Sequence, residues 1–142
     1  MDATKTATTV LEDIQVNVKI KLSALWASVM FCYIYADYFG LYVPGKLQRM
    51  LKGLGPFGVT TQGTLLICSL VLAIPSVMIF LSVALKPKPN RWLNIIFGVI
   101  YTAIILRTMW SWSFFIFYGV IEIVLTGLVV WYAWNWPRQK AA

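Results

Sequence analysis

The sequence contains no histidine, only two cysteines and few charged residues. Without histidine, haem lacks its commonest ligand and a serine or cysteine nucleophile lacks its usual base. Cys32 and Cys68 both fall inside apolar runs and have neither CxxC nor zinc-site spacing, so we interpret them as small core residues. Glycine-rich phosphate loops and acidic metal clusters are also absent from the sequence. We therefore expect that the protein is not an enzyme and needs no metal and no cofactor.

The scarcity of charge is matched by an excess of apolar residues. Charged residues make up 12% of the chain and hydrophobic residues 60%. Soluble proteins average about 25% charged and about 45–50% apolar residues. The mean hydropathy is +0.75. A soluble domain of 142 residues with this composition would leave much apolar surface in water. The composition therefore predicts one integral membrane domain covering residues 1–142.

Four apolar runs are each long enough to cross a bilayer, which takes about 20 residues. They cover residues 22–42, 62–85, 92–112 and 113–136. The third and fourth runs abut, and we place a tight turn with an interfacial aromatic belt in the segment MWSWSFF between them. A single helix of about 45 residues would be far longer than a hydrocarbon core of about 30 Å. The fold class predicted is all-α, a four-helix transmembrane bundle.

Basic residues outnumber acidic ones by 12 to 5, and most lie between the apolar runs. There they meet lipid headgroups or set the topology, so no nucleic acid is expected as a partner. With four spans, eight lysines and arginines lie on the side of the two termini: Lys5, Lys19, Lys21, Lys86, Lys88, Arg91, Arg138 and Lys140. The first loop holds three: Lys46, Arg49 and Lys52. The positive-inside rule then predicts a multi-pass protein of the inner (plasma) membrane with both termini cytoplasmic. The polar N-terminal segment lacks the features of a cleavable signal, so we expect the first span to direct insertion.

Two flanking segments have the pattern of helices that lie on the membrane. Near the N-terminus, Thr9 and Glu12 fit a capping box, and apolar residues follow at helical spacing toward Leu22. The alternation of β-branched residues in the segment 16–20 argues against that helix.

The first loop carries the clearer amphipathic pattern. Leu47, Met50, Leu51 and Leu54 share one helical face, and the three basic residues of the loop lie off that face. The glycines and proline of the segment 53–56 end the pattern. This helix is either a surface anchor or a lid over a site.

Three ionisable side chains lie inside the apolar runs: Asp37, Arg107 and Glu122. A charged side chain in hydrocarbon costs at least about 2.5–3.5 kcal/mol, so these residues are the informative ones. At a rise of about 1.5 Å per residue, Asp37 and Arg107 lie roughly 7 Å, and Glu122 roughly 13 Å, below the outer ends of their helices. Because all three fall in the outer half, we predict one ligand-binding or proton-coupling site.

Helical spacing predicts which residues surround that site. Trp26 and Tyr33 share the face of Asp37, and Tyr118 shares the face of Glu122. Pro75 faces them from the second span, where it removes a backbone hydrogen bond, kinks the helix and frees a carbonyl where a cavity could open. An acid framed by aromatic rings suits an organic cation or amine.

Structural alternatives remain for each charged residue. Asp37 and Arg107 could form a pair that locks the first span against the third, and Glu122 could make a structural hydrogen bond to a tyrosine or serine. One guanidinium neutralises only one of two carboxylates, so either one acid is protonated or the pocket keeps a net negative charge.

Three stretches carry a resemblance to a known family: LEDIQVNVKIKLSALWASVMFCYIYADYFGLYVPG, LKPKPNRWLNIIFGVIYT and FFIFYGVIEIVLTGLVVWYAWNWP. They resemble a family of small bacterial and archaeal four-helix membrane proteins known as a domain of unknown function. The resemblance implies a four-span inner-membrane protein and brings no activity with it. In size and span count the chain also looks like the small multidrug resistance transporters. Those have their essential glutamate in the first span, where this chain has Asp37 near the end of the span.

Two functional hypotheses follow from the sequence. The first is a transporter or channel-like protein that binds a small cation or amine around Glu122 and Asp37, with proton exchange as a possible coupling. The second is a non-transporting binding or accessory protein for a lipid or a partner membrane protein. A bundle of this size holds a pocket but hardly a pore, so besides the lipid bilayer we expect a homo-oligomer, with Gly98, Gly119 and Gly127 among the close-packing positions.

Overall fold

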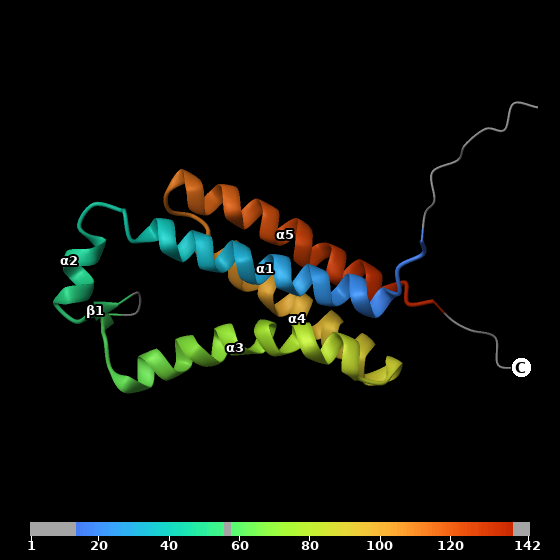
Figure 1. Ribbon diagram of the computed structural model, residues 1–142. Helices are drawn as coiled ribbons and strands as arrows, with labels where there is room; N and C mark the ends of the chain where they lie inside the picture. The colour runs from blue at the N-terminus through green and yellow to red at the C-terminus, as the bar shows by residue number, and fades with distance from the viewer. Residues whose placement is uncertain (1–13, 56–57, 138–142) are drawn as a thin grey trace, which may run out of the picture.

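The computed structural model describes residues 14–55 and 58–137, and its main elements are four long helices (Figure 1). Each is long and apolar enough to cross a membrane: α1 (Val18–Gly40), α3 (Gln62–Ala84), α4 (Pro87–Thr108) and α5 (Ser113–Trp134). The predicted four-helix transmembrane bundle is therefore confirmed. The turn predicted between the last two apolar runs is also present, because α4 ends at Thr108 and α5 begins at Ser113. The start of α1 and the end of α5 lie at one end of the bundle, which we call the termini end, and the first loop lies at the other.

The predicted N-terminal helix is not continuous with α1. Asn17 caps α1, since its side chain accepts a hydrogen bond of 2.9 Å from the backbone N–H of Lys19, and residues 14–17 are not helical. The cap stops the helix because Asn17 takes up a non-helical backbone conformation to reach that N–H. The predicted capping box at residues 9–12 lies outside the described residues.

The loop helix α2 (Lys46–Leu51) is shorter than the amphipathic pattern predicts. It ends before Leu54, which lies in β1 (Leu54–Gly55) and pairs with β2 (Gly58–Val59) in a small antiparallel hairpin. Gly53 has φ +72°, a left-handed conformation that stops α2 and turns the chain into β1. The glycines and proline of this segment, which predict a helix stop, also suit a hairpin turn. Leu47, Met50 and Leu51 form an exposed apolar face.

Neighbouring helices pack around a common centre in the order α3, α1, α5, α4. α1 packs against α3 and α5, and α4 packs closely against α5 but only lightly against α3. Gly98 brings α4 and α5 together, because a Cβ there would lie 2.7 Å from Val130 Cγ2. Gly119 likewise makes room for Met109, while no atom lies within 4 Å of a Cβ built on Gly127. Two of the three predicted close-packing glycines are thus used inside the bundle.

A buried hydrogen-bond network joins α1, α3 and α4 in the half nearer the termini. The amide oxygen of Asn94 accepts from Trp26 Nε1 (2.7 Å) and from Ser82 Oγ (3.3 Å). The Asn94 amide nitrogen donates to Asn90, and Asn90 Nδ2 donates to the backbone carbonyl of Ser82 (2.6 Å). All four side chains are fully buried. The network supplies the hydrogen bonds that hydrocarbon cannot.

Basic side chains at the termini end cap the helices. Lys19 Nζ donates to the carbonyls of Val83 (3.2 Å) and Leu85 (2.6 Å), where α3 ends. Arg91 donates to the carbonyls of Ala133 (3.1 Å) and Trp134 (3.2 Å), where α5 ends. A cation at a helix C-terminus satisfies free carbonyls and interacts favourably with the helix dipole. Part of the basic charge that the sequence analysis assigned to topology therefore also holds the helices together.

Replacing Asn94 with alanine should destabilise the bundle. The substitution leaves the indole N–H of Trp26 and the side-chain oxygen of Asn90 without partners, which costs about 1–3 kcal/mol for each buried polar group. Unfolding in mixed micelles, followed by circular dichroism, measures this loss. Ser69→Ala is the control, because Ser69 Oγ bonds only the Leu65 carbonyl of its own helix (2.8 Å). Equal stability of the two variants would contradict the structural role of the network.

Candidate functional site

Glu122 is the acid that the fold buries. It lies on the inward face of α5, and its side chain is 5% exposed. Within the described part of the chain, no hydrogen bond or ion pair reaches its carboxylate, and Asp37 is the charged group that acts on it electrostatically. Thr126, one turn further along α5, donates to the backbone carbonyl of Glu122 (2.9 Å) rather than to the carboxylate. The site therefore has a buried acid without a cationic partner among the described residues.

Tyr33 lies next to this acid on α1. Its hydroxyl is buried and has no hydrogen-bond partner among the described residues, and Glu122 is among the ionisable groups near it. The Tyr33 ring packs against Tyr101 of α4 with 6.5 Å between ring centroids. The Trp26 ring packs edge-on against the Tyr101 ring with 5.9 Å between centroids, but its indole N–H already donates to Asn94. Tyr33 thus keeps a buried hydroxyl without a partner among the described residues, whereas the Trp26 indole is already hydrogen-bonded.

Asp37 lies one turn closer to the α2 end than Tyr33 and is exposed. Its charged neighbour is Lys46 of α2 rather than Arg107. Arg107, in the last turn of α4, is exposed and makes no hydrogen bond or ion pair with either acid in the described parts of the chain. The structure therefore brings Asp37, Glu122 and Tyr33 together and leaves Arg107 outside. The structural pair of Asp37 with Arg107, considered as an alternative, is not formed.

Pro75 acts on the site through the shape of α3. Because proline has no N–H, the carbonyl of Val71 loses its helical partner, and the Tyr101 hydroxyl of α4 donates to that carbonyl instead. The Val71 carbonyl therefore accepts a hydrogen bond from Tyr101 and does not itself open a cavity. The buried residues of α3 are Pro75, Met78 and Ser82, all in its half nearer the termini.

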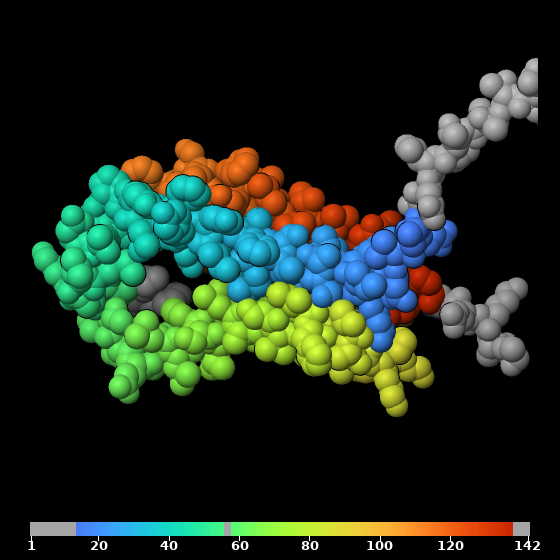
Figure 2. All heavy atoms as spheres, viewed as in Figure 1, coloured from blue at the N-terminus to red at the C-terminus, as the bar shows by residue number. Residues whose placement is uncertain are grey.

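The other half of α3 diverges from α1 toward the α2 end (Figure 1). Figure 2 shows a hollow at that end, between α2 and the helices α1 and α3. This divergence explains why Asp37, near the end of α1, is exposed while Glu122, deeper in the bundle, is buried.

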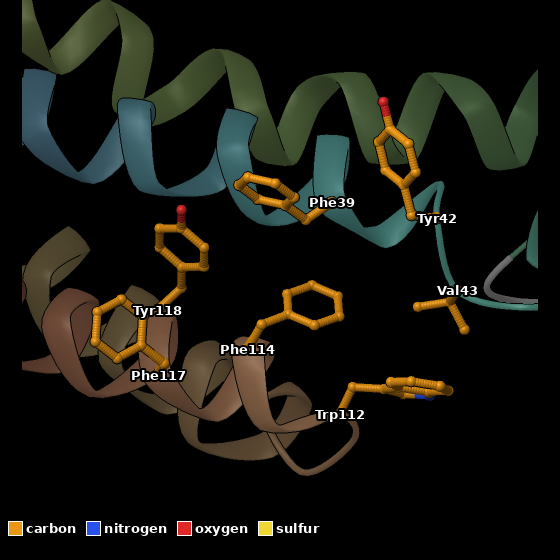
Figure 3. A pocket seen from close by; sticks show the side chains of 7 residues that line it. All are labelled: Phe39, Tyr42, Val43, Trp112, Phe114, Phe117 and Tyr118. Carbon is orange, nitrogen blue, oxygen red and sulfur yellow. The ribbon is translucent and has the colours of Figure 1, made fainter.

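An aromatic pocket of about 440 Å³ lies between the end of α1 and the start of α5 (Figure 3). Tyr118 and Phe39 stack across it with ring centroids 6.5 Å apart. Its walls are almost entirely apolar and are formed by Phe39, Tyr42, Val43, Trp112, Phe114, Phe117 and Tyr118. Tyr118 therefore lines this pocket, one helical turn before Glu122, instead of pointing at the acid as the sequence suggested.

Two residues near the site could not be assigned from the sequence. The hydroxyl of Tyr101 bonds to a carbonyl on another helix, which helical spacing within α4 does not reveal. Lys46 was placed on the polar face of a surface helix, whereas it is half-buried beside α1. The sequence feature that could have indicated this position of Lys46 is Gly40, because a glycine leaves room for another group to approach the helix closely.

The Tyr101–Val71 bond should couple energetically to Pro75. Tyr101→Phe removes the donor and should cost about 0.5–1.5 kcal/mol. In the background of Pro75→Ala the Val71 carbonyl can regain a helical N–H, so the same substitution should cost much less. A double-mutant cycle on unfolding free energies measures the coupling. Additive effects of the two substitutions would contradict this assignment.

Comparison with known proteins identifies one related group. No curated protein matches the chain, and no solved structure matches it. One family model does match, over residues 10–142, nearly the whole length of the chain. The chain belongs to this family, which is described as a family of unknown function, DUF6326.

Proposed function

We propose that the protein is a transporter or channel-like membrane protein that binds a small cation or organic amine at Glu122. The observation that carries this proposal is the burial of the Glu122 carboxylate without a cationic partner among the described residues. A buried charge is costly unless it is paired, and ionisable residues inside membrane spans typically belong to ion or substrate pathways. A bound cation supplies the missing partner.

The neighbours of Glu122 fit such a ligand. The unpaired Tyr33 hydroxyl offers an oxygen to a cation beside the carboxylate, and the aromatic rings of Tyr33 and Tyr101 supply cation–π surface. Asp37, exposed nearer the α2 end, provides a second negative charge on the way to Glu122. A carboxyl that binds a cation can release a proton in exchange, so we propose proton exchange as the coupling.

For the orientation, we propose that the α2 end faces outward and that both termini are cytoplasmic in the inner (plasma) membrane. Support comes from the excess of lysine and arginine on the side of the termini. We further propose a homo-oligomer, since Gly127 lies on an exposed and open face of α5.

The orientation can be tested with one cysteine. In a Cys32→Ser/Cys68→Ser background, Gln48→Cys places a thiol on the exposed surface of α2. A membrane-impermeant maleimide added to intact cells should label this thiol. A cysteine at position 88, in the first turn of α4 at the termini end, should react only after lysis. The reverse pattern would place the α2 end in the cytoplasm.

The aromatic pocket favours a second candidate function, a non-transporting protein that binds a lipid or a partner membrane protein. The walls of the pocket are apolar and lie at one end of the spans, where aromatic residues commonly sit at the membrane interface. This function needs the pocket but neither of the acids.

Glu122→Gln should abolish cation binding. The amide keeps the shape of the side chain but removes its charge, so the affinity for methylammonium and benzylammonium should fall at least tenfold in calorimetry on purified protein. Uptake of radiolabelled methylammonium into proteoliposomes should fall with it. Glu12→Gln is the matched control, because it makes the same chemical change in the N-terminal segment outside the spans.

The outcomes separate the two candidate functions. Binding that depends on Glu122, without any uptake, would replace transport with a binding role. Unchanged binding in Glu122→Gln would remove the cation site. Co-purified lipid lost on substitution of Phe117 in the pocket, with no amine binding at all, would favour the lipid-binding protein.

A further inference from the structure

Lys46 is a cation that the first loop turns back toward the bundle. It is the first residue of α2, and its N–H donates to the carbonyl of Val43 (3.0 Å) across the turn that follows α1. Gly45 makes this turn possible with φ +79°, a conformation that other residues rarely adopt. The side chain is half-buried, and its Nζ lies 5.4 Å from the ring centroid of Phe115 on α5. The ammonium is thus held between α1 and α5.

Gly40 leaves the space that the ammonium occupies. A Cβ at this position would lie 2.6 Å from Lys46 Nζ and 3.2 Å from Phe115 Cζ. Gly40 is buried and is the last residue of α1. The ammonium therefore lies against the C-terminal end of a helix, where the helix dipole favours a positive charge.

The Lys46 ammonium lies on the α2 side of the two acids, Asp37 and Glu122. Asp37 is one turn below Gly40 on α1, and Lys46 is the cation that acts on it. Glu122 lies seven residues after Phe115 on α5, and Tyr33 lies seven residues before Gly40 on α1. Seven residues of helix rise about 10 Å, so Lys46, Asp37 and Glu122 form a descending series from the α2 end into the bundle.

We propose that Lys46 is the resident cation of this site, and that the ligand is an amine whose ammonium group displaces it. This inference rests on the proposed function and specifies its ligand. The Lys46 ammonium lies against an aromatic ring and a helix C-terminus, and its charge acts on the Asp37 carboxylate without forming an ion pair among the described residues. These surroundings suit an ammonium group. Metal cations such as Mg²⁺ and Ca²⁺ prefer several oxygen ligands around them. An amine on its way to Glu122 meets the same partners, and its ammonium group takes the place of the Lys46 ammonium there.

Removal of the resident cation should strengthen ligand binding. Lys46→Met keeps most of the length of the side chain but loses its charge, so the affinity for benzylammonium should rise at least fivefold. Gly40→Ala should have the same effect by a different route, because its methyl group occupies the position of the ammonium and the flexible lysine can move away. Lys46→Arg keeps a cation and should gain less than Lys46→Met.

The control is Lys52→Met, which removes the same charge from the same loop. Lys52 is exposed at the end of α2, so general attraction between the loop and a cation changes equally in both methionine variants. Calorimetry with benzylammonium and methylammonium, and with sodium as the non-amine probe, gives the affinities. Thermal unfolding of each variant shows whether it is folded.

Each outcome decides between the two proposals. Tighter amine binding in Lys46→Met and Gly40→Ala, but not in Lys52→Met, supports the resident cation. If binding depends on Glu122 but both variants bind like the wild type, or if Lys52→Met gains as much as Lys46→Met, the resident cation is overturned and the Glu122 site stands. If the two variants bind amine more tightly while Glu122→Gln has no effect, Asp37 is the binding acid and the function proposed for Glu122 falls. Equal gains for sodium and for amines would overturn the choice of an amine.

Discussion

Polar groups inside this bundle have no water to bond, because the hydrocarbon core offers no hydrogen-bond partners. Most of the interior obeys this constraint strictly. Asn94 collects the indole of Trp26 and the hydroxyl of Ser82, and Tyr101 donates to the carbonyl that Pro75 leaves free. These bonds tie α1 and α3 to α4, although α4 packs only lightly against α3. Against this background the unsatisfied groups stand out.

The unsatisfied groups gather in one place. The Tyr33 hydroxyl has no partner and the Glu122 carboxylate has no cation among the described residues, and the two lie near each other. α3 has no buried residue before Pro75, and Figure 2 shows a hollow at the α2 end, between α2 and the helices α1 and α3. A structure that satisfies its polar groups elsewhere and not here is arranged as a binding site would be. This contrast supports the proposed function more than the presence of an acid alone.

The identity of the local cation changes how the charge of the site is understood. Sequence alone paired the two acids with Arg107, since all three lie in the same half of their helices. In the fold Arg107 faces outward, and Lys46 takes its place beside Asp37. Lys46 lies on a short loop helix, and we propose that a ligand amine displaces it. When both acids are ionised, the two acids and one cation carry one formal negative charge.

The amino-acid sequence is enough to predict the four spans and the depth of Glu122 in its helix, because these depend on apolar run length and on a constant helical rise. Arg107 lies nearer the end of its helix than predicted, because α4 ends at Thr108. The sequence also predicts that Glu122 lies deeper in its span than Asp37 or Arg107. Which side chains contact one another depends on how the helices and the first loop pack together. The partner of the Pro75 carbonyl, the hairpin after α2 and the position of Lys46 over Gly40 all join segments distant in sequence or depend on a turn. Helical periodicity describes one helix at a time, so it cannot say which face of a neighbouring helix or loop will lie opposite.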